Sequence, residues 1–360
     1  MKTLAIVGST GSVGHSALKA LEKNKHKFKL IFLTAHKNKK KILMQKNKFQ
    51  PKKIFLTKEN KYDFEFFLKN YKNKIDYVVS AISGFEALDT NIKLLKISKN
   101  LLLANKETII CGGKIFLNLS HKYKCKILPI DSEHYCLNFL INNLKLKTNI
   151  SQFYISASGG PFFKKKIKYD QTIESVLNHP TWKMGKKITV DSSNFANKVL
   201  ELFEANILFN IPVSKLSIFI DPTSRVHSMI KFKNNIYLPV IHKPTMQIPI
   251  LNSLEMKNNF DISLRNLNFS IISPDKKKFP LIKLGFKILG SYGHNGMIIF
   301  TVLNERLVKL FLKKKIMYGD IQSNLINFFK RKIILKYLKK KLNNIEDISE
   351  FINIFNNLKI

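Results

Sequence analysis

Three glycines near the start of the chain, Gly8, Gly11 and Gly14, limit its possible folds more than any other feature. They follow a short apolar run at residues 3–7, typical of a buried strand, and precede apolar residues at helical spacing over 13–21. Glycine permits a tight turn close to a phosphate, and a helix start offers free N–H groups and a positive dipole end. The GxxGxxG spacing is less specific than GxGxxG, and such a triplet is often only a turn. The strand and helix on either side nevertheless predict a loop that binds the phosphates of a dinucleotide.

Further strand-like segments follow in the first third of the chain, and stretches with helical periodicity separate several of them. These segments are residues 28–34, 53–57, 75–82, 101–104 and 126–130. Such alternation is typical of βαβ units and predicts a parallel sheet. A parallel sheet binds its ligand at the carboxyl ends of the strands, where the motifs discussed below are located.

Beyond residue 132 the pattern becomes mixed. Strands are expected at residues 152–157, 216–220 and 236–240, and a helix at 194–209. Residues 258–284 are irregular and contain prolines, and from residue 296 the chain is helical and lysine-rich. We therefore expect an α/β protein in four parts: a Rossmann-like, parallel-sheet dinucleotide-binding domain at 1–131, an α+β domain at 132–257, a linker at 258–284 and a C-terminal helical domain at 285–360.

The chain is strongly basic, with 62 Lys and Arg residues against 24 Asp and Glu residues and a formal net charge of +38. One interpretation is a protein that binds nucleic acid or an acidic membrane, because clustered cations gain affinity by releasing counterions. These cations are instead spread over the whole length and are almost all lysine, whereas nucleic-acid surfaces favour arginine and interleaved aromatic residues. We therefore expect no specific nucleic-acid partner and a role for the charge in attracting anionic substrates.

The apolar runs and the cysteines bear on the cellular compartment. No apolar run approaches the roughly 20 residues that a membrane helix needs, and the one at residues 4–7 is too short for a signal peptide. Cys111, Cys125 and Cys136 are an odd number without CxxC spacing or a histidine-rich neighbourhood, which argues against a disulfide scaffold and a zinc site. We expect a cytoplasmic protein with no membrane partner.

The end of the second predicted strand bears on the choice of dinucleotide. An enzyme that uses NAD usually carries an acidic residue there, which holds the ribose 2′-hydroxyl group. This chain has His36, Lys37 and Asn38 after Ala35, which supply a cation and an amide but no carboxylate. These residues suit a 2′-phosphate, so we infer NADPH. The alternative is that Lys37 is one solvated lysine among many.

Two carboxylates, Asp131 and Glu133, follow the strand predicted at residues 126–130. In extended backbone, residues i and i+2 point to the same side, so both carboxylates are expected to face one ligand. Carboxylate oxygens without cysteine or clustered histidine suit a hard divalent cation, Mg²⁺ or Mn²⁺. The alternative is ordinary surface acidity, although acidic residues are scarce in this chain.

Two segments carry groups that bind anions. Asp191, Ser192 and Ser193 have the composition of a helix start, where hydroxyl and free N–H groups bind anions. The Ser-Gly-Gly run at residues 158–160 is a second candidate phosphate loop.

A further polar group follows on the helix expected at residues 194–209. Asn197 and Glu201 are four residues apart and share a helix face, with Lys198 beside them. A surface ion pair between Lys198 and Glu201 is the alternative interpretation, because such spacing usually produces one.

Taken together and in this order, the motifs resemble the 1-deoxy-D-xylulose 5-phosphate reductoisomerase family. The resemblance is carried by Gly8-Ser-Thr-Gly-Ser-Val-Gly14, Leu102-Leu-Ala-Asn-Lys-Glu107, Leu128-Pro-Ile-Asp-Ser-Glu-His134, Ala157-Ser-Gly-Gly-Pro-Phe162, His179-Pro-Thr-Trp-Lys-Met-Gly185, Lys187-Ile-Thr-Val-Asp-Ser192, Asn197-Lys198 with Glu201, and Val226-His-Ser-Met229. It covers the chain to about Glu305 and is weaker beyond. It implies an NADP-dependent oxidoreductase that rearranges and reduces 1-deoxy-D-xylulose 5-phosphate to 2-C-methyl-D-erythritol 4-phosphate, in the non-mevalonate isoprenoid pathway. It also implies a homodimer.

The resemblance implies a role for each matched residue. The implied NADPH-binding residues are Thr10, Gly11, Ser12, Val13, His36, Lys37, Asn38, Asn105, Glu107 and Gly185. The implied ligands of the divalent cation are Asp131, Glu133 and Glu201, which are also catalytic together with Lys106. The implied substrate-binding residues are Lys106, Ser132, Glu133, Ser158, His179, Ser192, Asn197, Lys198 and Glu201. Trp182 is implied to lie on a flexible loop that closes over the substrate, with Met184 beside it.

The chain departs from the family pattern in three places. His36 replaces a usual glycine, Asp221-Pro-Thr-Ser224 replaces His-Pro-Gln-Ser, and Pro244-Thr-Met-Gln247 replaces Pro-Asp-Met-Arg. Every matched metal and phosphate ligand is intact, so we expect an active enzyme. His227 fits either a supporting role at the metal side or core packing.

Overall fold

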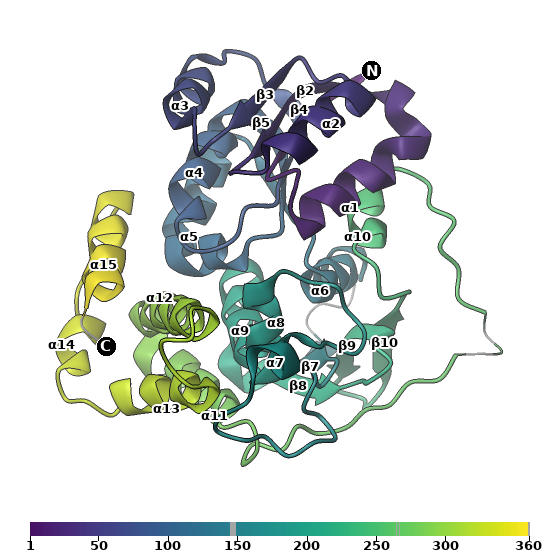
Figure 1. The fold of residues 1–360 in the computed structure, drawn as a ribbon. Helices are drawn as coiled ribbons and strands as arrows, with labels where there is room; N and C mark the ends of the chain where they lie inside the picture. Colours follow the sequence, from purple (N-terminus) through teal and green to yellow (C-terminus); the bar gives the residue numbers. More distant parts are fainter. Residues whose placement is uncertain (145–148, 264, 266, 359–360) are drawn as a thin grey trace. The chain divides into compact units, whose positions relative to one another are not determined.

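The computed structural model describes residues 1–144, 149–263, 265 and 267–358 (Figure 1). Its residue contacts divide the chain into two compact units. The first unit comprises Met1–Thr108, Phe116–Tyr135 and Thr245–Phe260, and the second comprises Ile109–Ile115, Cys136–Pro244 and Asp261–Ile360. Each unit is described separately below.

The first unit is built on a six-stranded sheet in the order β3-β2-β1-β4-β5-β6, in which every neighbouring pair is parallel. The strands are β1 Lys2–Val7, β2 Phe28–Ala35, β3 Lys53–Leu56, β4 Ile75–Ser80, β5 Ser98–Leu103 and β6 Lys126–Pro129. Each strand overlaps a segment expected from the sequence, so the predicted parallel sheet is confirmed. The strand order reverses between β1 and β4, and a ligand crevice is expected at such a switch point.

The helices of the first unit complete this doubly wound arrangement. They are α1 Ser12–Leu21, α2 Lys39–Phe49, α3 Lys61–Asn70, α4 Ala87–Ile97, the ends of α5 Lys106–Lys122, and α10 Gln247–Ser253. α10 comes from far downstream and packs against α1 (Figure 1). Ile250 and Leu251 of α10 join the core that Leu4 and Ile6 of β1 form with Leu18 of α1. The first unit is therefore not one continuous stretch of sequence.

The second unit contains a mixed four-stranded sheet in the order β10-β9-β7-β8. Its strands are β7 Ile150–Ala157, β8 Leu216–Ile220, β9 Val226–Phe232 and β10 Tyr237–Ile241. β7 is parallel to β8, while β9 is antiparallel to both β7 and β10. The sequence predicted the other three strands but missed β9. Its first five residues are all buried, His227 and Ser228 among them, so polar and apolar residues do not alternate as in a half-buried strand.

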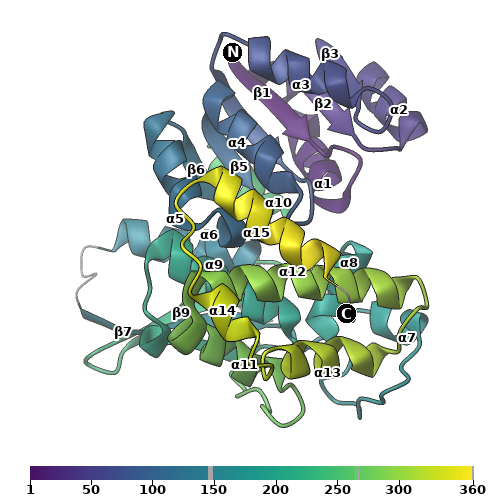
Figure 2. The ribbon, with the colours of Figure 1, turned by 90° about the vertical axis from the view of Figure 1, so that its left-hand side faces the viewer.

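The second unit also contains α-helices. They are most of α6 Ser132–Asn143, α7 Ile173–Leu177, α8 Lys186–Ser193, α9 Ala196–Phe209, α11 Leu281–Lys287, α12 Gly293–Leu312, α13 Tyr318–Phe328, α14 Ile334–Leu338 and α15 Ile345–Asn357. α12 contacts α8, α9, α13, α14 and α15 (Figure 2), which confirms the helical character expected for the last part of the chain. α11 begins inside the segment expected to be an irregular linker. Among the described residues, no helix combines the length and the apolar character needed to cross a membrane.

Candidate active site

The glycine loop connects β1 to α1 in the first unit. Gly8 has φ of +81°, and a Cβ atom there would meet the carbonyl oxygen of Ala81, just after β4, at 2.7 Å. A Cβ at Gly14, inside α1, would meet the carbonyl oxygen of Gly8 at 2.3 Å. A Cβ at Gly11 would meet nothing closer than 3.4 Å, an ordinary contact. Two of the three glycines are therefore required by close backbone packing.

The loop leaves the start of α1 open to a ligand. α1 begins at Ser12 and has no side-chain cap on its first N–H groups, so these donors are available to an anion. Ser9 holds the loop from behind, since its hydroxyl donates to Gln45 Oε1 at 2.6 Å and its carbonyl accepts from Gln45 Nε2 at 3.0 Å. Lys41 Nζ donates to the carbonyl of Thr10 at 3.0 Å. The arrangement fits the pyrophosphate of a dinucleotide.

His36, Lys37 and Asn38 follow β2, the strand next to β1, and all three are exposed. Asn38 also has a structural role, because its Oδ1 accepts from the backbone N–H of Lys41 at 3.0 Å and caps α2. His36 Nδ1 lies 3.3 Å from Thr57 Oγ1. Since parallel strands end at one edge of the sheet, these residues and the glycine loop share that edge.

The start of α5, after β5, is a buried polar cluster. Asn105 caps the helix, because its Oδ1 accepts from the N–H of Thr108 at 2.6 Å. Its Nδ2 donates to Glu107 Oε2 at 3.0 Å. Lys106, also buried, places Nζ 3.1 Å from Asp131 Oδ2. The carboxylate of Asp131 offsets the free-energy cost of removing the Lys106 ammonium group from water.

Asp131 and Glu133 lie at the start of α6, so the extended backbone expected for them is wrong. The carbonyl of Asp131 accepts from the N–H of Tyr135 at 2.8 Å, the first hydrogen bond of a helix, and Glu133 lies in its first turn. Asp is a common residue at such a start because its side chain can accept from free N–H groups. One carboxylate oxygen of each residue still lies within 4.8 Å of the other. The expected pairing of the two carboxylates therefore holds, with a different backbone.

His134 and Ser132 surround these carboxylates. His134 is fully buried and places Nδ1 3.3 Å from Asp131 Oδ1. The hydroxyl of Ser132 donates to Glu133 Oε2. No role was expected for His134. Once a helix is recognised after Asp131, the spacing of three residues indicates that the two side chains share a helix face.

In the second unit, His179 joins two of the predicted phosphate ligands. Its Nε2 lies 3.0 Å from Ser158 Oγ and 3.2 Å from Ser192 Oγ. Its Nδ1 accepts from the backbone N–H groups of Thr181 at 3.2 Å and Trp182 at 3.0 Å. Because Nδ1 accepts, the proton of the neutral ring is assigned to Nε2, which faces the two hydroxyls.

The charge state of His179 follows from its surroundings. Burial and, to a smaller extent, the nearby charge of Lys198 lower the pKa of His179 to about 4. The ring is therefore neutral at neutral pH. It acts there as a hydrogen-bond donor through Nε2 rather than as a cation.

Asp191, Ser192 and Ser193 end a helix, so the expected helix start at these residues is wrong. They form the last turn of α8, which starts after Gly185. Asp191 is fully buried, and its carboxylate lies 2.9 Å from Lys187 Nζ, one helical turn earlier, and accepts from Asn304 Nδ2 at 2.8 Å. A turn with φ of +66° at Phe195 then leads into α9. The ion pair between Lys187 and Asp191 lies within α8. The composition of residues 191–193 did not indicate that these residues end a helix.

Lys198 and Glu201 are buried on α9, which excludes the surface ion pair. Their side chains are 9% and 1% exposed, and Lys198 Nζ lies 2.7 Å from Glu201 Oε2. Asn197 Nδ2 donates to Glu201 Oε1 at 2.5 Å. Glu201 thus has both oxygens occupied by side chains of its own helix, as a buried carboxylate requires.

Trp182 and two histidines form an aromatic stack in the second unit. The ring of Trp182, in the loop between α7 and α8, meets His227 of β9 edge-on at a centroid distance of 6.2 Å. His227 is buried and stacks on His242 at 3.6 Å. These contacts agree with the packing alternative for His227. His242 was missed, because nothing in its local sequence marks it.

Asp221, one of the departures from the family pattern, organises the turn after β8. It is fully buried, and its carboxylate accepts from the backbone N–H groups of Arg225, Val226 and Ser270 at 3.0–3.3 Å. It also accepts from the hydroxyl of Thr223 at 2.8 Å.

Gly185, expected near the cofactor, is exposed, and among the described residues a Cβ there would meet nothing within 4 Å. The packing of Gly185 therefore gives no reason for a glycine.

Comparison with known proteins gives matches along the length of the chain. The sequence model of 1-deoxy-D-xylulose 5-phosphate reductoisomerase matches residues 4–73 and 66–113, and two models of its C-terminal domains match residues 127–209 and 241–356. The reductoisomerase of Pelagibacter ubique (strain HTCC1062) is 38% identical over 391 aligned residues, covering 100% of this chain and 99% of the relative. That of Clostridium tetani (strain Massachusetts / E88) is 33% identical over 349 aligned residues, covering 89% and 90%.

Solved structures agree with the fold. A DOX-P reductoisomerase crystallised in complex with NADPH, fosmidomycin and magnesium has a TM-score of 0.90 at 28% identity, covering 99% of this chain and 97% of that one. The 1-deoxy-D-xylulose 5-phosphate reductoisomerase from Zymomonas mobilis in complex with NADPH has a TM-score of 0.83 at 26% identity, with the same coverage.

Proposed function

The chain belongs to the 1-deoxy-D-xylulose 5-phosphate reductoisomerase family, and from this we propose that it is an NADP-dependent oxidoreductase that converts 1-deoxy-D-xylulose 5-phosphate to 2-C-methyl-D-erythritol 4-phosphate, a step of isoprenoid precursor synthesis. The observation that carries the proposal is the buried Lys106–Asp131 pair, with Glu133 beside it. A cation and two carboxylates at the carboxyl edge of a dinucleotide-binding sheet suit a substrate whose carbonyl and hydroxyl oxygens develop negative charge.

We assign the divalent cation, Mg²⁺ or Mn²⁺, to Asp131 and Glu133 of the first unit and Glu201 of the second. All three offer carboxylate oxygens, the donor type that hard cations prefer, so the residues fit the ion. A related structure contains magnesium. When bound, the cation supplies positive charge to the reacting oxygens of the substrate. Lys106 adds a second positive charge, and its contact with Asp131 fixes where that charge lies.

We assign NADPH to the carboxyl edge of the first unit. The glycine loop fits its pyrophosphate, because it leads into the start of α1, which has no side-chain cap. Thr10, Ser12 and Val13 lie at the same helix start, and His36, Lys37 and Asn38 are the candidates for the 2′-phosphate. Asn105, Glu107 and Gly185 are the remaining candidates. NADPH supplies the hydride that reduces the rearranged substrate.

We assign the substrate phosphate to the second unit, at Ser158, His179, Ser192, Asn197 and Lys198. His179 is neutral and directs an N–H toward the two serine hydroxyls, so it can orient them or donate to a phosphate oxygen. Lys198 supplies the positive charge, and Ser132 remains the candidate for contact with a reacting oxygen.

The test is an assay in which substrate, NADPH and the divalent cation are each left out in turn while NADPH absorbance is followed. We expect absorbance to fall only in the complete mixture, because the cation and the cofactor act on one substrate. Oxidation of NADPH that continues in EDTA would instead indicate a dehydrogenase that needs no metal, and no oxidation in the complete mixture would contradict the proposed function.

We further propose that the protein acts as a cytoplasmic homodimer. The homodimer is what membership of the family implies, and its test is the mass in solution by light scattering. The three cysteines are an odd number without CxxC spacing, which suits a reducing compartment. Localisation of a tagged protein in its own cell tests the compartment.

A further inference from the structure

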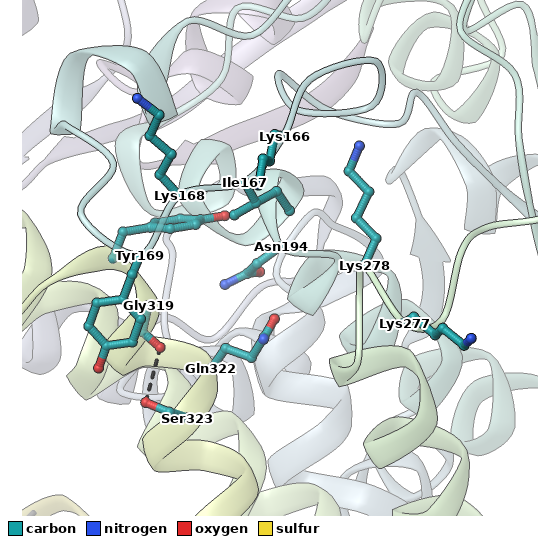
Figure 3. Close-up of a pocket in the computed structure, with 11 residues that line it drawn as sticks. Lys166, Ile167, Lys168, Tyr169, Asn194, Lys277, Lys278, Gly319, Gln322 and Ser323 are labelled. Atoms are coloured by element: carbon teal, nitrogen blue, oxygen red, sulfur yellow. Dashed lines mark hydrogen bonds between the residues drawn. The ribbon is translucent and has the colours of Figure 1, made fainter.

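The second unit contains a cavity of about 530 Å³ that no assignment above uses (Figure 3). Three segments and one single residue line it: Lys166–Tyr169 before α7, Lys277 and Lys278 before α11, the first turns of α13 from Tyr318 to Ser323, and Asn194 between α8 and α9. None of these residues is among the candidate ligands of NADPH, the cation or the substrate.

The lining is positively charged. Lys166, Lys168, Lys277 and Lys278 contribute cations, and no acidic side chain is among the described residues that line the cavity. Lys278 is partly engaged, since its Nζ donates to the carbonyl of Phe163 at 2.8 Å, whereas the other three lysines are exposed. Four cations around one hollow attract an anion.

Two carboxylates near the cavity are already bound to other groups. Asp320 accepts from the hydroxyl of Tyr169 and from the N–H of Met317, the latter at 2.8 Å. Asp275 accepts from the N–H groups of Lys277 at 2.7 Å and Lys278 at 3.2 Å. These contacts hold the lining segments in place and occupy both carboxylates.

Asn194 provides an independent sign of a ligand. The residue is only 3% exposed, and its Oδ1 accepts from the N–H of Ala196 at 2.9 Å. Its Nδ2 is buried without a hydrogen-bond partner among the described residues. Figure 3 shows Asn194 in the middle of the lining, between Tyr169 and Lys278 and beside Gln322. A buried amide donor without an acceptor is costly, so an acceptor oxygen is expected next to it.

The start of α13 and the aromatic side chains define the rest of the ligand. Gln322 and Ser323 supply polar side chains from the second turn of this 11-residue helix, whose N-terminal end is already capped by Asp320. A Cβ at Gly319 would meet Tyr169 Cδ2 at 2.2 Å, so glycine allows the Tyr169 ring to lie against the helix. Tyr169, Tyr318 and Ile167 give the cavity an apolar wall. The lining therefore suits an anionic group attached to a small organic group.

We propose that this cavity is a second anion site, which binds the phosphate or diphosphate group of a small phosphorylated metabolite. It is separate from the substrate-phosphate residues, and the proposal does not depend on the proposed function. The lysines attract the anion, Asn194 Nδ2 donates to one of its oxygens, and the aromatic wall contacts the organic part.

The first experiment uses inorganic pyrophosphate as the probe and the full chain in EDTA. Lysines are acetylated with a limiting reagent, and mass spectrometry gives the rate at each lysine. We expect Lys166, Lys168 and Lys277 to react about fivefold more slowly with pyrophosphate, because a bound anion shields and pairs them. Lys313, Lys314 and Lys315, exposed in the turn after α12, should be unchanged. Equal protection of both groups would overturn the proposal, since it indicates only general counterion attraction.

Matched variants locate the site. The triple variant Lys166→Gln, Lys168→Gln, Lys277→Gln is compared with Lys313→Gln, Lys314→Gln, Lys315→Gln, which loses the same charge. Calorimetry should show that the first variant loses one equivalent of pyrophosphate, or binds it at least about tenfold more weakly, while the control stays within about twofold. Equal losses in the two variants would overturn the proposal.

Asn194→Asp is the sharper change, because it keeps the acceptor for Ala196 and replaces the amide donor with a carboxylate oxygen. We expect this variant to lose the protection of Lys168 and Lys277 by pyrophosphate. Protection equal to that of the wild-type chain, in a variant with unchanged circular dichroism, would show that Asn194 does not contact the anion.

Discussion

The imidazole rings of His227 and His242 stack with centroids 3.6 Å apart and planes inclined by 15°. Burial, and then the charge of His227, lowers the pKa of His242 to about 3, against the hydrogen bond to the carbonyl of Lys243 that raises it. The pKa of an unfolded histidine is about 6.5, so the unfolded chain binds more protons between these two values. The free energy of unfolding therefore falls as the pH is lowered from about 6.5 toward about 3.

His242→Phe tests this relationship, because it keeps an aromatic ring against His227 and removes the titrating group. We expect the melting temperature to fall less in this variant than in the wild-type chain between about pH 7 and about pH 4.5. Circular-dichroism melts measure the difference, with the exposed residue His121 changed to Phe as the control. Parallel pH curves for the wild-type chain and His242→Phe would show that His242 is not a source of acid sensitivity.

Asp131→Asn separates the metal site from the cofactor site. Asp131 pairs with Lys106 at 3.1 Å and contacts His134 at 3.3 Å, and Asn keeps its shape without the charge. We expect turnover to fall by about 100-fold or more, because the lost carboxylate is a proposed cation ligand. The affinity for NADPH, measured by fluorescence titration, should change less than about twofold, because the glycine loop lies on other elements. Asp89→Asn, at an exposed helix position, is the control. A loss of NADPH binding in Asp131→Asn as large as its loss of turnover would contradict the division of the two sites.

Features that depend on local pattern were predictable from the sequence. The strands of the parallel sheet were predicted because each is a short apolar run between turn residues, and the turn from β1 into α1 because a strand precedes the glycines and a helix follows. The family motifs supplied the candidate ligands, among which Ser158, His179 and Ser192 lie within hydrogen-bond distance in the second unit.

Features that depend on tertiary contacts were not predictable. Residues 191–193 carry capping side chains but end α8, where Lys187 pairs with the charge of the buried Asp191 and Asn304 donates a hydrogen bond to it. β9 was hidden because contacts with β7 and β10 bury its polar residues along with its apolar ones. The burial of Lys198 and Glu201 follows from packing around α9, which spacing along the helix does not encode.

Asp221→Ala tests whether this departure from the family pattern is structural. Its carboxylate accepts from four backbone N–H groups and from the hydroxyl of Thr223, and removing it leaves those donors unsatisfied in a buried turn. We expect a loss of about 2–4 kcal/mol in the free energy of unfolding, measured by urea denaturation. Asp261→Ala is the control, because Asp261 is exposed and its carboxylate accepts from the adjacent N–H of Ile262 at 2.8 Å. Equal losses in both variants would show that Asp221 does not hold the turn.

The glycine loop gives a prediction in which two glycines of one motif differ. A Cβ at Gly14 would lie 2.3 Å from the carbonyl oxygen of Gly8 and 2.6 Å from Ser9 Cα, and backbone atoms cannot yield as a flexible side chain can. Gly14→Ala must therefore move the loop away from α1, which spoils the geometry of the free N–H groups. We expect the dissociation constant for NADPH to rise by about tenfold or more.

Gly11→Ala is the comparison within the same motif: Gly11 is itself a candidate cofactor residue, but among the described residues its Cβ would meet no atom closer than 3.4 Å, and its φ is not positive. We expect its dissociation constant for NADPH to stay within about threefold of the wild-type value. Circular dichroism of both variants distinguishes a moved loop from an unfolded chain. Equal weakening of NADPH binding in Gly11→Ala and Gly14→Ala would contradict this prediction. It would show that the methyl group at Gly11 collides with the bound cofactor, because the protein backbone leaves room for it.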